Sequence, residues 1–312
     1  MKSNDKPARY VITGVTGQVG GAVAHALLAN NKSVRAVVRD AAKGAAWAAL
    51  GCEVAIADMN DTAALTTAFL GAAGVFFLLP PTFDPSPGFP EARAQIEAAA
   101  AALRAALPAK VVCISTVGAQ ATQTSLLTQL ALLEKEFGGL PMPVAFLRPG
   151  WYMENARWDI AAAIDTGVIP SLLQPLDRPV PMVATADVGR MAADLLLQTW
   201  TGRRIVELEG PRRVAPNEIA AALAAILGRP VRMEIVARGT WGDLFRSQGM
   251  KNPDPRMRMI DGFNEGWIDF STNYAGTCKG ETPLETVLRD LVGQASITVP
   301  RLLLRPALRN ET

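Results

Sequence analysis

The stretch YVITGVTGQVGGAVAHALL, Tyr10 to Leu28, decides the fold. It joins a short β-branched run to an alanine- and leucine-rich run, the pattern of a buried strand followed by a helix. Gly14, Gly17 and Gly20 stand three residues apart at the junction. Glycines there allow a tight turn, close approach of a pyrophosphate to the backbone and close packing of the helix. The stretch therefore predicts a dinucleotide-binding turn, with a plain flexible turn as the alternative.

The same alternation of strands and helices continues through the first half of the chain. The predicted strands are 10–13, 33–39, 53–57, 75–79, 110–115 and 144–147, and the predicted helices are 18–29, 41–50, 61–70, 91–107 and 124–138. Strands that alternate with helices form parallel β-α-β units. We therefore expect an α/β fold with a doubly wound parallel Rossmann sheet.

Beyond about residue 150 the alternation loosens, although 187–200 and 204–210 still predict one helix and one strand of the same sheet. The predicted organisation is an NAD(P)-binding Rossmann domain over 1–150 (completed by about 185–210), a smaller C-terminal α/β substrate lobe over 151–184 and 211–294, and a basic tail over 295–312. Segment 239–275 has no clear period. Its large apolar residues fit either a pocket wall or the packing of the lobe: Trp241, Met250, Met257, Met259 and Trp267.

Composition excludes several classes of protein. The 312 residues are 49% apolar with a net charge of +2, so we expect a sizeable core and no nucleic-acid partner. The cysteines, Cys52, Cys113 and Cys278, are far apart, which predicts a reducing compartment without disulfides or a metal site. The N-terminus is polar, and the longest apolar runs reach about half the length of a bilayer span. We expect a cytoplasmic protein with no membrane partner.

The end of the second predicted strand indicates which dinucleotide is bound. An NAD site usually places an acidic residue there, whereas SVRAVVRD places Arg39, with Asp40 after it. A guanidinium suits a 2′-phosphate, so NADPH is the expected cofactor, and Asp40 keeps NADH open as the less favoured one. Asp58, after the third strand, is placed either to meet the adenine side or to serve as a turn residue.

Motifs along nearly the whole chain, in the same order, resemble the NmrA-like atypical short-chain dehydrogenase/reductases. They include VITGVTGQVGGAVAHALL, VRAVVRD, ADMND, VVCISTVGA, LRPGWYMEN, VATADVGRMAADLL and TPLETVLRDLV. The motif LRPGWYMEN, with the preceding Glu134, is most similar to the quinone-reductase branch, the NAD(P)H:quinone oxidoreductase type 2 proteins. The resemblance implies a Rossmann domain, a smaller C-terminal domain and NADP(H) between them.

The resemblance also implies the residues of the site. The phosphate loop is Gly14, Thr16, Gly17, Gln18, Val19 and Gly20, with Arg39 at the 2′-phosphate. The nicotinamide side is implied at the ends of strands four and five, at Leu78, Leu79, Pro80, Ser115 and Thr116. The floor of the substrate pocket is implied at Pro149, Gly150, Trp151, Tyr152 and Asn155.

The proton-relay pair of the wider superfamily is absent from this chain. No tyrosine (Tyr10, Tyr152 or Tyr274) has a lysine four residues later. Many relatives keep a polar group four residues before the position of Glu134, where this chain has Leu130. For a quinone, positioning by the protein and hydride from the cofactor suffice, with a proton from water, a nearby hydroxyl or Tyr152, the best side-chain candidate.

Two functions follow. The favoured one is an NADPH-dependent oxidoreductase that transfers hydride to a quinone or a similar small electrophile. The alternative is a non-catalytic, NADP(H)-sensing regulatory protein of the NmrA type, for which a protein partner is expected.

Overall fold

The centre of the molecule is an eight-stranded sheet, seen in a computed structural model that describes residues 8–271 and 276–298. All pairings within it are parallel, in the order β12-β10-β6-β5-β4-β1-β2-β3. The strands are β1 (Arg9–Ile12), β2 (Ser33–Val38), β3 (Glu53–Ile56), β4 (Ala72–Phe77), β5 (Val111–Ile114), β6 (Val144–Pro149), β10 (Arg203–Glu209) and β12 (Cys278–Lys279). The strand order reverses between β1 and β4, where open parallel sheets bind ligands. The predicted Rossmann fold is confirmed.

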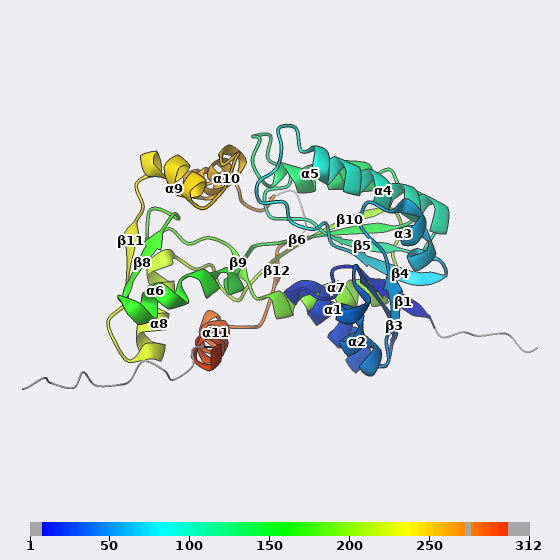
Figure 1. The fold of residues 1–312 in the computed structure, drawn as a ribbon, viewed down its shortest axis with the longest axis horizontal. Coiled ribbons are helices and arrows are strands. Elements are labelled where there is room, and N and C mark those ends of the chain that lie inside the picture. Colours follow the sequence, from blue (N-terminus) through cyan, green and yellow to red (C-terminus); the bar gives the residue numbers. More distant parts are fainter. Residues whose placement is uncertain (1–7, 272–275, 299–312) are drawn as a thin grey trace, which may run out of the picture.

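Helices cover both faces of this sheet (Figure 1). One face carries α1 (Gln18–Ala29), α2 (Ala41–Ala49) and α7 (Thr185–Leu197), and the other carries α3 (Thr62–Phe69), α4 (Pro90–Ala106) and α5 (Thr128–Phe137). Successive strand residues point to opposite faces, so Phe76 enters one core cluster and Phe77 the other. Burial on both faces explains why the strands are continuously apolar.

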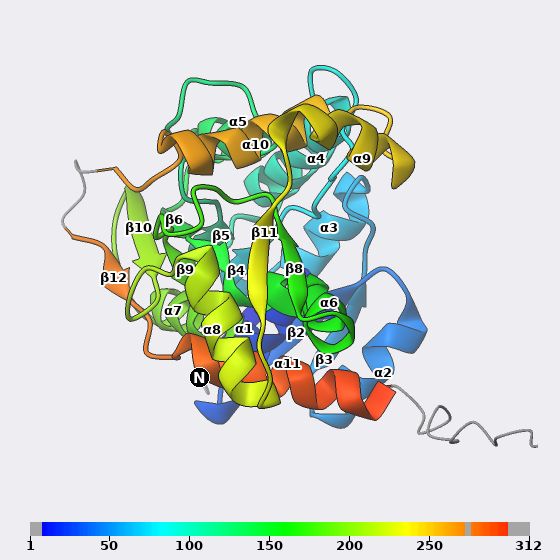
Figure 2. The ribbon, with the colours of Figure 1, turned by 90° about the vertical axis from the view of Figure 1, so that its left-hand side faces the viewer.

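The smaller lobe is built around two short parallel strands, β8 (Val168–Ser171) and β11 (Arg232–Ile235). Its other elements are β7 (Trp151–Tyr152), β9 (Met182–Val183), two 3-10 helices, η1 (Met153–Trp158) and η2 (Arg238–Thr240), and α6 (Ile160–Asp165), α8 (Pro216–Leu227), α9 (Trp241–Ser247), α10 (Asp254–Glu265) and α11 (Leu284–Thr298). Figure 2 shows β8 and β11 side by side, with α10 above them and α11 below.

The segment 239–275, which has no clear period in the sequence, contains helices α9 and α10. Their pattern is hidden because the buried face of α10 mixes apolar residues with Asp261, whose charge is paired with Arg238. Trp241 is fully buried, and its indole N–H donates to the carbonyl oxygen of Val236 over 2.9 Å. Trp241 therefore belongs to the packing of the lobe and not to a pocket wall.

Several element boundaries differ from those expected. Strand β4 runs from Ala72 to Phe77 rather than over 75–79, because its first residues pair with β1 despite their weak strand propensity. The last helix, α11, continues to Thr298, and the rest of the tail predicted at 295–312 lies outside the described residues. Of the helices that the structure describes, none is both long and apolar enough to cross a bilayer.

Candidate functional site

The turn between β1 and α1 has the backbone geometry that its glycines predict. Gly14 has φ +63°, in the left-handed region that favours glycine. A Cβ at Gly20 would collide with the carbonyl group of Gly14, standing 2.6 Å from its carbon and 2.9 Å from the nitrogen of Val15. Gly20 therefore lets the first turn of α1 pack directly on the loop, and any side chain there would push the loop away.

The first backbone amides of α1 are available to an anion. Gly17 is the N-cap without a side-chain cap, and its carbonyl accepts from Gly21 over 2.9 Å. The amides of Gln18, Val19 and Gly20 thus have no acceptor within the helix, and the positive end of the helix dipole lies among them. Thr16, Gly17 and Gln18 are exposed at this point. The donor set suits a pyrophosphate.

Val19, a residue of the predicted phosphate loop, can contact a phosphate only through its backbone amide. Its side chain is 5% exposed and lies in the core between the sheet and α1. A cofactor could contact its amide but not its isopropyl group. The predicted residue is therefore retained as a backbone donor.

Arg39 follows β2 and is exposed. No hydrogen bond or ion pair engages it within residues 8–271 and 276–298, so its guanidinium is available for a phosphate. Asp40 is in a different situation, because its Oδ1 accepts from the amide of Ala42 over 2.9 Å and caps α2. This pairing favours Arg39 over Asp40 as the group that meets the ribose.

Asp58 also serves a local structural role. Its Oδ1 accepts from the backbone amide of Asn60 over 2.9 Å and from the side-chain amide over 3.0 Å. These hydrogen bonds lower the pKa of Asp58, and the charge of Arg39 adds a smaller contribution in the same direction. Asp58 is therefore a turn residue that lies near Arg39, and its contact with the adenine side stays a prediction.

Lys43, which the sequence analysis did not single out, lies beside the phosphate loop. It is exposed on the first turn of α2 and lines a cavity of about 760 Å³ together with Thr16, Gly17 and Gln18. The position of Lys43 four residues after Arg39, just inside a predicted helix, was the available signal. A second cation here strengthens the case for a phosphate beside Arg39.

The far wall of this cavity includes the single histidine. His25 is exposed on α1 and stacks on Trp47 of α2, with ring centroids 5.0 Å apart. The contact joins two helices and lies away from the ends of the strands β4, β5 and β6.

The residues after β4 begin next to the phosphate loop. Leu78 lies next to Gly14, and its amide donates to the hydroxyl of Thr13 over 2.9 Å. Leu79 is 7% exposed and packs into the core, so only its backbone can face a cofactor. Leu78, Leu79 and Pro80 follow the strand rather than ending it, because β4 stops at Phe77.

Ser115 faces the protein interior. It is 3% exposed, and its hydroxyl donates to Oε1 of Glu134. Glu134 in turn accepts two hydrogen bonds from Arg148, over 2.8 and 2.7 Å, and Arg148 lies 3.5 Å from Glu207. Ser115 therefore belongs to a buried ion cluster beneath the strand ends. The neighbouring Thr116 is half-buried, and its hydroxyl donates to the carbonyl of Val117 over 3.1 Å.

The predicted pocket floor divides into supporting and accessible residues. Pro149 and Gly150 are buried, and a Cβ at Gly150 would stand 2.6 Å from the carbonyl oxygen of Pro181, so both support the floor. Trp151 is half-buried and meets Phe263 of α10 edge to face at 5.2 Å. Asn155 is exposed on η1. A flat aromatic surface is thus present on the acceptor side.

Tyr152 is the expected proton donor, and its environment keeps it protonated. Its hydroxyl has no hydrogen-bonding partner in the part of the chain that the structure describes. Burial raises the pKa of Tyr152 strongly, and the nearby charge of Glu154 raises it further. A phenol in this state stays protonated at neutral pH and gives up its proton reluctantly, and water remains the alternative proton source.

Two carboxyl groups that follow Tyr152 in the sequence, Glu154 and Asp159, were missed by sequence reasoning. Glu154 accepts from the amide and hydroxyl of Thr185 through Oε1, over 2.8 and 2.7 Å, while its Oε2 is buried without a partner. Burial raises the pKa of Asp159, one helical turn further on, to about 7. A group with such a pKa exchanges protons near neutrality. Glu154 stands inside the motif LRPGWYMEN and Asp159 outside it, but no pattern in the sequence marks either carboxyl group, because both properties arise from burial.

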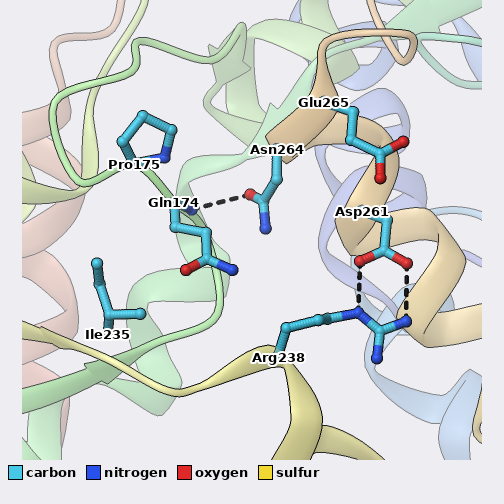
Figure 3. A pocket seen from close by; sticks show the side chains of 7 residues that line it. All are labelled: Gln174, Pro175, Ile235, Arg238, Asp261, Asn264 and Glu265. Carbon is cyan, nitrogen blue, oxygen red and sulfur yellow. Dashed lines mark hydrogen bonds and ion pairs between the residues drawn. The ribbon is translucent and has the colours of Figure 1, made fainter.

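A second cavity, of about 450 Å³, lies on the smaller lobe between the ends of β8 and β11 and helix α10 (Figure 3). Arg238 and Asp261 face each other across it in a two-pronged ion pair, over 2.6 and 2.8 Å. Asn264 accepts from the backbone amide of Gln174 over 2.9 Å. Because these polar groups already bind one another, we assign them a role in holding the lobe together and not in binding a ligand.

Metal-ligating side chains do not gather in the described structure. Across residues 8–271 and 276–298, no three or more His, Cys, Asp or Glu side chains are arranged to hold a metal ion. Cys52 and Cys113 are buried thiols, and burial raises the pKa of both.

Comparisons with known proteins agree with this geometry. The NmrA-like family model matches residues 7–253. Quinone oxidoreductase 2 of Escherichia coli strain K12 is 28% identical over 251 residues, 80% of this chain and 84% of the relative. An NAD(P)H azoreductase of Xenophilus azovorans is 27% identical over 71% of this chain and 75% of its own length. The structure of an NADPH-dependent quinone oxidoreductase from Escherichia coli, solved with NADPH, has a TM-score of 0.71 at 24% identity, covering 91% of this chain and 94% of that one.

Proposed function

This chain belongs to the NmrA-like family, and from that premise we propose that it is an NADPH-dependent reductase of quinones or similar small electrophiles. The observation that carries the proposal is the set of free amides that opens α1, together with the exposed Arg39 after β2, the strand that pairs with β1. Relatives described as an NAD(P)H azoreductase and a quinone oxidoreductase support the reaction class.

The residues present fit the phosphates of NADPH. Gly20 leaves room for backbone amides to face a pyrophosphate, and no side chain competes for them. Lys43 lines the cavity of the loop and Arg39 is exposed after β2, while Asp40 is occupied as a helix cap. Two cations and an occupied carboxylate favour a 2′-phosphate over a free 2′-hydroxyl.

The acceptor side supports a flat, electron-poor ring. When bound, the reduced nicotinamide supplies a hydride, so the protein needs mainly to position the acceptor and exclude water. The half-buried Trp151 offers aromatic surface for this purpose, and the buried Phe263 supports its ring edge to face. One proton completes the reduction of a quinone to a hydroquinone, and water supplies it where Tyr152 does not.

A non-catalytic, NADP(H)-sensing role is the second candidate, and one observation favours it. The hydroxyl of Ser115 is bound to Glu134, and the helix position of the usual lysine holds Leu130, which packs against the core. The described site therefore lacks the proton relay of the wider superfamily. In this role NADP(H) occupancy would change a surface that binds a protein partner.

Following the absorbance of NADPH with a panel of quinones separates the two functions. We expect consumption well above the spontaneous rate in the presence of the protein. Tight binding of NADPH, measured by calorimetry, with no consumption for any acceptor would instead support the sensing role. No binding of either nicotinamide nucleotide would contradict both.

A further inference from the structure

A short segment of the smaller lobe crosses to the Rossmann sheet next to the proposed acceptor site. Residues 267–271, which we term the strap, leave the end of α10 toward β12 at the sheet edge (Figure 2). Ile268 lies on the loop after β5, where a Cβ on Gly118 would stand 2.9 Å from the Ile268 side chain. The strap and α10 thus cover the loop that follows Thr116 and the ring of Trp151.

Gln120 connects this strap to the buried ion cluster. Its Oε1 accepts from a guanidinium N–H of Arg148 over 3.0 Å, and its Nε2 donates to the carbonyl oxygen of Asp269 over 2.8 Å. Arg148 can only donate and a carbonyl can only accept, so only a neutral amide in this orientation satisfies both. Neither a carboxylate nor an ammonium group could make both hydrogen bonds.

Two further contacts hold the strap to the end of β10. Arg213 binds the carboxylate of Asp269 with two hydrogen bonds, over 2.8 and 2.7 Å, and also binds Glu209 over 3.0 Å. The amide of Ser271 donates to Oε1 of Glu207 over 2.9 Å. These contacts anchor the strap at the outer part of the sheet, whereas Gln120 is the contact nearest to the strand ends β5 and β6.

We propose that Gln120 is a positioning residue that holds the strap down over the acceptor site and so sets the largest ring system the site admits. This inference rests on the proposed function, because it concerns the same site. Gln120 does not touch the reacting atoms. It acts through the strap, in which Asp269 accepts its hydrogen bond and Ile268 packs on the loop that follows Thr116.

The informative variant is Gln120→Glu. The carboxylate keeps its contact with Arg148, now between opposite charges, but it can no longer donate to the carbonyl of Asp269 and repels it. The buried cluster is thereby preserved while the strap is released. Gln123→Glu is the matched control, because it adds the same charge to the same loop and Gln123 has no contact with the strap.

Binding of a one-ring benzoquinone and a two-ring naphthoquinone to the NADP⁺-loaded protein tests this assignment. We expect Gln120→Glu to shift the ratio of the two dissociation constants toward the larger ring by roughly fivefold, the effect of losing one neutral hydrogen bond. The affinity for NADP⁺ and the Tm should stay unchanged. Gln123→Glu should leave the ratio as in the wild-type protein.

Hydrogen–deuterium exchange of the NADP⁺-loaded protein gives a second readout. Peptides that include 268–271 should exchange faster in Gln120→Glu and not in Gln123→Glu. An unchanged ratio of quinone affinities overturns the inference, whatever the exchange shows. If neither quinone binds the wild-type protein, the proposed function and the inference both fail, whereas quinone binding with an unchanged ratio removes the inference alone.

Discussion

The two ends of the proposed site are built in different ways. The phosphate end comes from one local stretch, in which Gly14, Gly17 and Gly20 shape the turn between β1 and α1. The acceptor end comes from segments far apart in the sequence, joined through Arg148 and Gln120. The local end is governed by backbone sterics, and the distant end by buried charges that must find partners. We therefore expect the phosphate end to be disrupted by a side chain at Gly20, and the acceptor end to be disrupted by the loss of a partner for a buried charge.

Gly20→Ala should have the largest effect, because its methyl group would collide with the carbonyl of Gly14. We expect NADPH affinity to fall by at least about 100-fold, since the loop and the amides would be displaced together. Calorimetric titration measures the loss. Gly293→Ala, at a helical glycine with open space around its Cβ position, is the control and should bind as the wild type does. Undiminished binding by Gly20→Ala would contradict the steric account of this end.

Arg148→Met tests the acceptor end. It leaves Glu134 and Glu207, whose side chains are 13% and 2% exposed, without their shared guanidinium. We expect the free energy of unfolding to fall by about 3–5 kcal/mol in urea titration. Arg232→Met, which removes an exposed pair with Glu234, should cost less than about 1 kcal/mol. Equal losses in the two variants would mean that burial of the cluster does not matter.

Arg39→Ala tests the phosphate end. It removes a charge but leaves the backbone of the glycine turn unchanged, so it separates the two contributions to cofactor binding. Loss of a charge-assisted contact should weaken NADPH by about 1.5–3 kcal/mol and leave NADH almost unaffected. Calorimetry with both nucleotides measures the difference. Lys43→Ala should show the same preference with a smaller loss. Equal weakening of both nucleotides would remove the argument for a 2′-phosphate.

Asp159→Asn should have an effect that depends on pH and is smallest in acid. The folded-state pKa of about 7 exceeds the ordinary value of 3.8, so the unfolded chain ionises first as pH rises. Stability from this group is full below about pH 4 and is lost as pH approaches 7. The variant should therefore be more stable than the wild type by up to about 4 kcal/mol at pH 8, since each pKa unit is about 1.4 kcal/mol, with little difference at pH 4.

Thermal unfolding at the two pH values measures this dependence. Asp165→Asn, an exposed carboxylate on the following helix, is the control and should show no dependence. An equal effect of Asp159→Asn at pH 4 and pH 8 would mean that Asp159 is not desolvated.

Much of the fold could be predicted from the sequence because its signals are local. The helix predicted over 18–29 is confirmed at both ends, and the sheet follows from apolar strands that alternate with helices. Helices α9 and α10 could not be predicted, because their buried face includes Asp261, which only a partner distant in the sequence makes tolerable.

The site residues likewise divide into those specified by local sequence and those specified by distant partners. The exposure of Arg39 and the turn at Gly14 agree with the sequence analysis, since a strand end and a glycine pattern specify them locally. The binding of Ser115 to Glu134 could not be predicted, nor could the raised pKa of Asp159. A hydroxyl at a strand end looks available in the sequence, and only packing shows that it is engaged.

By itself, the sequence determined the shape of the turn that we propose for a dinucleotide's phosphates, because three glycines and a helix start specify the backbone within one turn. Only the tertiary structure decided what surrounds the acceptor. The partners of Arg148, Gln120 and Asp269 lie on segments that approach one another after folding. Charge burial and hydrogen-bond direction depend on these distant neighbours, so no local pattern encodes them.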